Sequence, residues 1–297
     1  MPSTTTHSLR PGLRPVVILG APRSGTKLLR NLLGQSAACT TIPYGINHVW
    51  RHGLPAAAPD RRPATDATAQ CRQEIRSALL DLAGRPPSGY LVEKTCANTL
   101  RVPFVDQILP DAHVIHIVRD GRDAAVSARE QWTRPPSLGY LLGKLRYVPL
   151  QHASFLLEYL RNLWSGLWTS GHVQYWGPRY DGIEEDVRER PLLAVCARQW
   201  RACVTTCLDD LARRPDDRVT SIRYEALVQD RATIERVIAA LDLPDPDAIR
   251  TRYEAVVHDR SVGRWQRDLS SSEREKIHAL LAPTLHRIAD LPIRSPA

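Results

Sequence analysis

The amino-acid sequence predicts an α/β protein in which a central, mostly parallel sheet lies between two layers of helices. Two observations lead to this prediction. Short apolar runs rich in β-branched residues recur along the chain, and each has the pattern of a strand buried on both faces. Polar turn residues and then a helix-like stretch follow these runs, and strands that alternate with helices form parallel sheets covered on both sides.

Four segments have the pattern of such a strand. They are residues 15–20 (PVVILG), 90–93, 113–118 and 218–224. The segment LLRNLLG after the first strand has helical periodicity and ends at Gly34. In the segment TLRVPFVDQIL, Pro103 suits an early helix position and Pro110 ends the stretch.

The 297 residues are predicted to form one domain with a tail before it and an insertion in its middle. Residues 1–14 are polar and lack the apolar core of a secretory signal, so we expect a flexible tail before a single domain over 15–297. Residues 131–182 break the alternation of strands and helices. Their many Trp, Tyr, Leu and Pro residues predict a mainly helical insertion beside the functional site, where most aromatic side chains pack between helices and a few could line a pocket.

Composition limits the class of protein and of ligand. Hydrophobic residues make up 43% of the chain, but no apolar run reaches the roughly 18 residues that a membrane-spanning helix needs. The six cysteines form no CxxC pair, which favours buried, reduced thiols in a cytoplasmic protein. The net charge of +8 suits a ligand with several phosphates, and the dispersed basic residues do not indicate nucleic acid.

The strongest local signal is the segment GAPRSGTK, residues 20–27, between the first strand and the first helix. A glycine-bearing turn at this place leaves backbone N–H groups free, and the helix dipole favours an anion there. Side-chain donors come from Arg23, Ser24, Thr26 and Lys27. A plain strand-turn-helix connection is the alternative, but two cations and two hydroxyls in eight residues favour phosphate binding. An ATP-binding loop would place lysine directly after the last glycine, whereas Thr26 separates Gly25 from Lys27.

A second candidate anion site follows the strand HVIHIV. Arg119 stands at the carboxyl end of this strand, where open α/β sheets bind ligands. Ser127 follows about two helical turns later and can present its hydroxyl on the same side. A solvated cluster of the charges in RDGRD is the alternative for this motif taken alone, and a phosphate loop upstream disfavours it.

Together these motifs resemble those of sulfotransferases that use 3'-phosphoadenosine-5'-phosphosulfate (PAPS). GAPRSGTKLL resembles their 5'-phosphosulfate loop, in the form found in tyrosylprotein sulfotransferases and related bacterial enzymes, and Arg119 with Ser127 resembles their 3'-phosphate motif. The resemblance implies a P-loop-like α/β domain, PAPS as the donor, adenosine 3',5'-bisphosphate (PAP) as its product, and no metal. The loop residues that it assigns to PAPS are Arg23, Ser24, Gly25, Thr26, Lys27 and Leu28.

Further matches extend the resemblance. Glu93-Lys94-Thr95 resembles an acidic-Lys-Thr element, although Cys96 stands where proline is frequent. Tyr224, followed by Glu225, resembles a tyrosine that helps to hold the nucleotide. The segment SVGRW, residues 261–265, resembles the late loop that closes over the 3'-phosphate. This loop offers Ser261, Arg264 and Arg267.

The chemistry implied is in-line transfer of a sulfuryl group to a hydroxyl-type acceptor, with Arg23 and Lys27 stabilising the charge that develops. The family commonly uses a glutamate base soon after the first helix, but Gly45 stands where we expect it. His48 is the nearest replacement, because its ordinary pKa lies near neutrality, and a histidine that only packs near the surface is the alternative. Glu93 is a second candidate, and an acceptor that ionises easily would need no base.

Two other functions remain open at this point. A nucleotide-binding protein with altered or no sulfuryl transfer would explain the missing glutamate. An ATP-dependent kinase is disfavoured by the position of Lys27 and by the lack of a clear acidic partner for Mg²⁺. The acceptor could be a small molecule, a glycan, a lipid or a natural product, and nothing in the sequence chooses among them.

Overall fold

The computed structural model describes residues 9–55, 57–133, 176–214, 218–289 and 291. Within them a five-stranded sheet, parallel throughout, has the strand order β2-β3-β1-β4-β5. Its strands are β1 (Leu13–Leu19), β2 (Cys39–Thr41), β3 (Gly89–Glu93), β4 (His113–Val118) and β5 (Val219–Arg223). The predicted α/β class with a parallel central sheet is therefore confirmed.

The four predicted strands correspond to β1, β3, β4 and β5, with ends that differ by two residues or fewer. The sequence did not indicate β2, which is three residues long and lies at the edge of the sheet. A run this short has too few residues to show a period. The predicted first helix and the helix with Pro103 near its start are also present.

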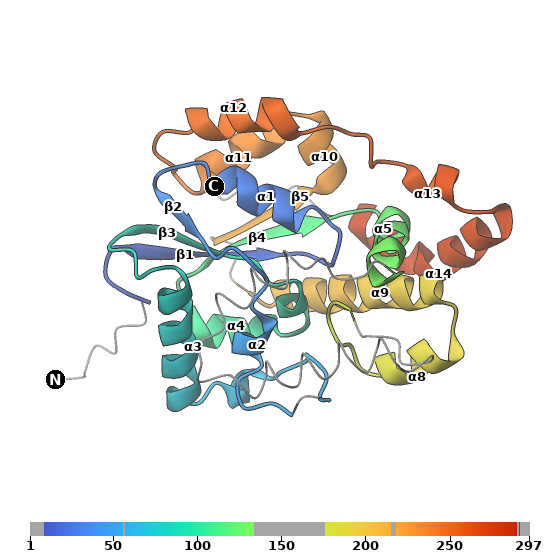
Figure 1. Cartoon of the computed structure of the whole chain (residues 1–297), viewed down its shortest axis with the longest axis horizontal. Helices are drawn as coiled ribbons and strands as arrows, with labels where there is room; N and C mark the ends of the chain where they lie inside the picture. Colours follow the sequence, from blue (N-terminus) through green and yellow to red (C-terminus); the bar gives the residue numbers. More distant parts are fainter. Residues whose placement is uncertain (1–8, 56, 134–175, 215–217, 290, 292–297) are drawn as a thin grey trace.

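Helices cover both faces of the sheet (Figure 1). The helices on one face are α1 (Thr26–Leu33), α10 (Tyr224–Gln229), α11 (Ala232–Ala240) and α12 (Asp247–Val256). The other face carries α2 (Asn47–Trp50), α3 (Ala69–Leu82) and α4 (Val102–Ile108). The 3₁₀ helices η1 (Ala64–Asp66) and η2 (Cys96–Leu100) contact α4. The remaining helices are α5 (Gly121–Thr133), α8 (Ile183–Glu189), α9 (Leu192–Leu211), α13 (Arg264–Asp268) and α14 (Ser271–Ala289).

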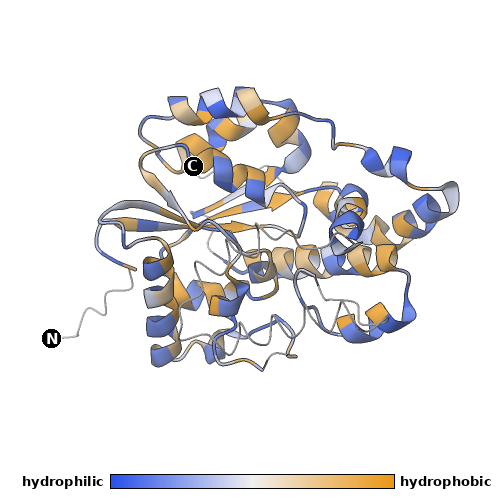
Figure 2. Cartoon of the chain, viewed as in Figure 1, coloured by the Kyte–Doolittle hydropathy of each residue, from blue (hydrophilic) through white to orange (hydrophobic). Residues whose placement is uncertain are grey.

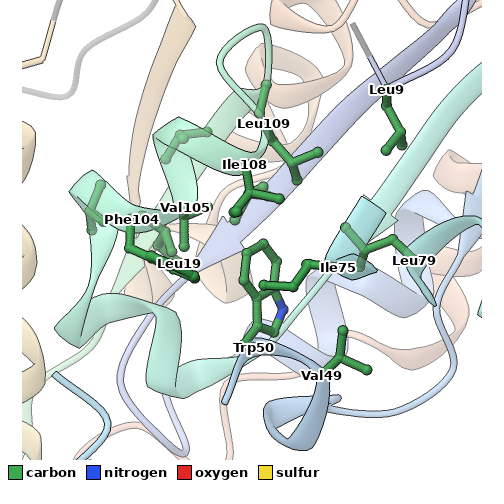
Figure 3. Packing of buried hydrophobic residues seen from close by; sticks show 14 of the residues in the cluster. Leu9, Leu19, Val49, Trp50, Ile75, Leu79, Phe104, Val105, Ile108 and Leu109 are labelled. Carbon is green, nitrogen blue, oxygen red and sulfur yellow. The ribbon is translucent and has the colours of Figure 1, made fainter. Parts of the chain in front are cut away.

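Each face of the sheet has its own hydrophobic core, and the outer sides of the helices are largely polar (Figure 2). Val16 and Ile18 of β1 point toward α1 and α11, whereas Val17 and Leu19 point to the opposite core. On that side the indole of Trp50 packs among apolar side chains of α3 and α4, including Ile75 (Figure 3). The two-residue period of a strand buried on both faces explains this division.

Two predicted segments fall largely outside the described residues. Of the predicted tail, residues 1–8 lie outside them, and Leu9 is buried against the core. Of the predicted helical insertion, residues 134–175 lie outside them. Residues 131–133 end helix α5, and residues 176–182 form a loop that leads into α8.

The order of the strands brings the two predicted anion sites together. β1 and β4 are neighbours, and Val17 of β1 lies in register with Val114 of β4 and with Glu93 of β3. All strands are parallel, so the loops after β1, β3 and β4 leave the same edge of the sheet. This edge is where open α/β sheets hold ligands.

Candidate nucleotide and transfer site

The turn after β1 has a backbone that only particular residues allow. Gly25 has φ of +90°, and a Cβ there would lie 2.4 Å from Cδ2 of Tyr224. A Cβ on Gly20 would lie 2.6 Å from the carbonyl oxygen of Ile117. Arg23 also adopts a positive φ, 67°, which is uncommon for a residue with a side chain and is found at ligand-binding turns. The loop is therefore fitted closely against β4 and the residue after β5.

The start of helix α1 offers donors for an anion. Gly25 is the N-cap of this helix and no side chain caps it, so the N–H groups of the first turn have no partner within the helix. The hydroxyl of Ser24 is fully buried and has no hydrogen-bond partner among the described residues. A buried polar group without a partner is costly unless a ligand or water pairs with it. Free amides and a buried hydroxyl together fit a phosphate or phosphosulfate group.

Arg119 holds this loop from the end of β4. Arg119 is 4% exposed, and its guanidinium donates to the carbonyl oxygens of Arg23, at 2.9 Å, and of Ser261. The same group stacks on the ring of Tyr224, with Cζ 4.5 Å from the ring centroid, and lies 3.8 Å from the Asp123 carboxylate. Segments more than 140 residues apart in sequence thus meet at one guanidinium.

The other predicted 3'-phosphate residues lie beside Arg119. Ser127, on helix α5, accepts a 2.8 Å hydrogen bond from Nε of Arg23. The hydroxyls of Tyr224 and Ser261 are 2.6 Å apart. The two predicted anion sites therefore share a border, formed by the Arg23 side chain and the Ser127 hydroxyl.

The late loop over this border is fixed by a carboxylate that the sequence reasoning did not assign. Asp123 is 1% exposed and accepts hydrogen bonds from the backbone N–H groups of Gly263, at 2.8 Å, and of Trp265, at 3.0 Å. Its only sequence signal was its place among the charges of the RDGRD motif. Arg264 pairs with Glu130 and Asp268, and Arg267 is exposed and donates to the Arg260 carbonyl.

The segment after β3 places Glu93 inside the protein. Its carboxylate is completely buried and accepts hydrogen bonds from Trp50 Nε1, at 3.2 Å, and Asn98 Nδ2, at 3.0 Å. Burial raises the pKa of Glu93 above its ordinary value, against the opposing effect of its hydrogen bonds. Three residues further on, Cys96 lies with its Sγ 3.7 Å from Oγ1 of Thr26 in the phosphate loop.

Gly45 and His48 lie close to this segment. The Cβ of a residue at position 45 would be 3.7 Å from Nζ of Lys94, so Gly45 leaves space beside an ammonium. His48 is half-buried in helix α2, whose first residue, Asn47, donates to the Asp60 carboxylate at 3.0 Å. Asp60 is fully buried and also accepts 2.7 Å hydrogen bonds from Arg51 and from the backbone N–H of Arg179. Helix α2 is thereby tied to the loop at 176–182.

Lys27, the remaining predicted catalytic residue, is exposed in the first turn of α1.

All six cysteines are free thiols. Five of them are buried, and Cys96 is half-buried. Burial raises the pKa of Cys203 to about 12. Among the described residues, no group of three or more His, Cys, Asp or Glu side chains could hold a metal ion. None of their helices has the length and apolar character that crossing a membrane requires.

Comparison with known sequences identifies the class of protein that this fold and site define. A sequence profile of the sulfotransferase family matches residues 15–175, which is more than half of the chain. The chain therefore belongs to the sulfotransferase family. No curated protein sequence matches it significantly.

Solved structures of sulfotransferases share the fold. Sulfotransferase STF9 from Mycobacterium avium is 16% identical, with a TM-score of 0.56 over 97% of this chain and 79% of the other. A sulfotransferase from Alicyclobacillus acidocaldarius is 18% identical, with a TM-score of 0.50 over 94% of each chain. The sulfotransferase domain from the curacin biosynthetic pathway is 14% identical, with a TM-score of 0.50 over 92% and 98%. At these identities the likeness is one of fold.

Proposed function

We propose that this protein transfers a sulfuryl group from PAPS to a hydroxyl-type acceptor on a small molecule, glycan, lipid or natural product. One observation carries the proposal: Arg119 and Ser127 meet the phosphate loop at Arg23. PAPS bears negative groups at both the 3' and the 5' position of one nucleoside. A pair of adjoining anion sites at one sheet edge suits such a ligand better than one with a single phosphate group.

In this proposal the amides of Gly25, Thr26, Lys27 and Leu28, with the hydroxyls of Ser24 and Thr26, hold the 5'-phosphosulfate. The 3'-phosphate is bound by Arg119, Ser127, Ser261, Arg264 and Arg267. Tyr224 packs against the loop. Arg119 acts partly by holding the loop backbone, since its fork already donates to two carbonyl oxygens. Ser127 can turn its hydroxyl toward a phosphate because it accepts only from Arg23 among the described residues.

Sulfuryl transfer resembles phosphoryl transfer, with a loose in-line transition state whose charge lies on peripheral and leaving oxygens. Arg23 and Lys27 are the cations of the loop that can stabilise this charge. For the proton of the acceptor we propose His48 as the base, because no carboxylate stands at Gly45. Glu93 then has a positioning role, since both of its oxygens already accept hydrogen bonds inside the protein.

Thermal unfolding in the presence of PAP, ADP or ATP tests the nucleotide part of the proposal. A ligand at 100 times its Kd adds about 2.7 kcal/mol to the free energy of unfolding, which raises the melting temperature measurably. We expect PAP to stabilise the protein more than ADP or ATP does, with no need for Mg²⁺. Stabilisation by ATP that depends on Mg²⁺ would favour a kinase instead.

The glycine at position 45 favours one second candidate, a nucleotide-binding protein of this fold that transfers no sulfuryl group. The two candidates differ in a single result. Stabilisation by PAP together with transfer of ³⁵S from labelled PAPS to an acceptor supports the enzyme. Stabilisation by PAP without any labelled product across phenols, sugars, sterols and lipids supports the second candidate.

A further inference from the structure

A cavity of about 280 Å³ opens beside helix α9, away from the phosphate loop. Three arginines line it, Arg61, Arg198 and Arg201, against one carboxylate, that of Asp181. The lining therefore carries three positive charges and one negative charge. Part of its wall is apolar, because Leu100 and Ala202 also line the cavity, together with Tyr180.

The three arginines differ in what already pairs with them. Arg198 donates to the Asp186 carboxylate at 2.5 Å, which raises the pKa of the guanidinium. Arg61 lies 4.0 Å from Asp181, and both side chains are more than 60% exposed, so this pair is weak. Arg201 is half-buried, and its guanidinium forms no hydrogen bond or ion pair with another residue in the described ranges, although its backbone carbonyl accepts from Thr205.

A half-buried guanidinium with unused donors in a cavity predicts the chemistry of the occupant. Its planar fork matches a carboxylate with two parallel hydrogen bonds. One guanidinium that has no partner in the described part of the chain, next to two that have carboxylates, calls for one negative charge rather than several. A volume near the lower end of small-molecule sites, with an apolar wall, suits a compact carboxylate attached to a non-polar body.

The cavity is connected to the phosphate loop by one short element. Leu100 is the last residue of η2, and Cys96, the first residue of η2, contacts Thr26 of the loop. A 3₁₀ helix rises about 2 Å per residue, so η2 covers about 8 Å between these two ends. This span is comparable to the length of one phenylpropanoid unit.

We propose that this cavity anchors the acceptor by a carboxylate group, which Arg201 binds, so that the acceptor is a small hydroxy acid of phenolic or similar apolar character. This inference rests on the proposed function for the identity of the ligand as acceptor. The binding of a carboxylate at Arg201 can be tested without it.

Calorimetric titration with 3-(4-hydroxyphenyl)propanoate and with its neutral amide tests the inference. Both titrations are done with and without saturating PAP, which keeps the carboxylate out of the phosphate loop. We expect the carboxylate to bind about tenfold more tightly than the amide, as a charge-assisted hydrogen bond implies. Arg201→Gln should remove this difference and leave the binding of the amide unchanged, with an unaltered melting temperature.

Arg252→Gln is the matched control, since Arg252 is an exposed arginine of helix α12 on the other side of the sheet. This variant should keep the tenfold preference. Equal binding of acid and amide by the unaltered protein, no binding of the acid, or a preference that persists in Arg201→Gln overturns the inference. Failure of PAP to bind would instead count against the proposed function, while the titrations without PAP still report on Arg201.

Discussion

At the scale of single residues, the chemistry of the site depends on what stands near Gly45. The free space at this position lies beside the Lys94 ammonium, and the buried carboxylate of Glu93, the residue before Lys94, has both oxygens engaged by Trp50 and Asn98. A base must come within hydrogen-bonding reach of the acceptor hydroxyl. Half-buried His48, three residues after Gly45, is more accessible to an acceptor than the enclosed Glu93 is.

His48→Ala should therefore lower turnover about 100-fold or more, because general-base catalysis commonly contributes factors of about 10² to 10⁴. The affinity for PAP should stay within about twofold, since His48 is not among the residues assigned to the nucleotide. Steady-state assays of sulfuryl transfer, together with calorimetry of PAP binding, provide the two measurements. His258→Ala, which alters an exposed histidine before the late loop, is the control. Unchanged turnover in His48→Ala would remove this residue from the mechanism.

At the scale of elements, strand β4 serves both stability and function. It ends in Arg119, and it carries His116 in the middle of the sheet, where the imidazole is fully buried and its Nδ1 has no hydrogen-bond partner among the described residues. Burial lowers the pKa of His116 to about 4 from an ordinary value of 6.5. The folded protein therefore holds this histidine neutral under conditions in which the unfolded chain protonates it.

The sign of the pH effect follows from these two values. A group with a lowered pKa in the folded state contributes stability above the unfolded pKa, and this contribution is lost as the pH falls through the folded pKa. From pH 7.5 to pH 5, His116 should cost about 2 kcal/mol of unfolding free energy. Urea unfolding at both pH values should show this loss, and His116→Val should reduce it by that amount. An equal pH dependence in His116→Val would contradict the buried neutral state.

The elements also show which features a single sequence can predict. Strands of five or more residues, such as β1 and β4, were located correctly, because their β-branched runs are buried on both faces. β2 was missed, since three residues at a sheet edge show no period. The short helix α2 was missed for the same reason, although its residue Trp50 is central to one core.

At the scale of the whole molecule, the gathering of Arg23, Arg119 and Ser127 was predictable, because parallel strands place their following loops at one edge. The hydrogen-bond partners of the Arg119 guanidinium were not predictable. They include the carbonyl oxygen of Ser261, 142 residues away, and such a contact depends on the tertiary fold rather than on any local pattern. The cavity at Arg201 combines distant loops with helix α9 and could not be predicted for the same reason.

The proposed function depends on two adjoining anion sites that bind the two ends of one nucleotide. Comparison of calorimetric affinities for PAP and for adenosine 5'-monophosphate, which lacks the 3'-phosphate, tests this claim most directly. We predict that the unaltered protein prefers PAP by at least about tenfold, and that Arg119→Gln, checked by its melting curve, and Ser127→Ala each reduce this preference. Equal affinity for the two nucleotides, or a full preference in both variants, would contradict the account.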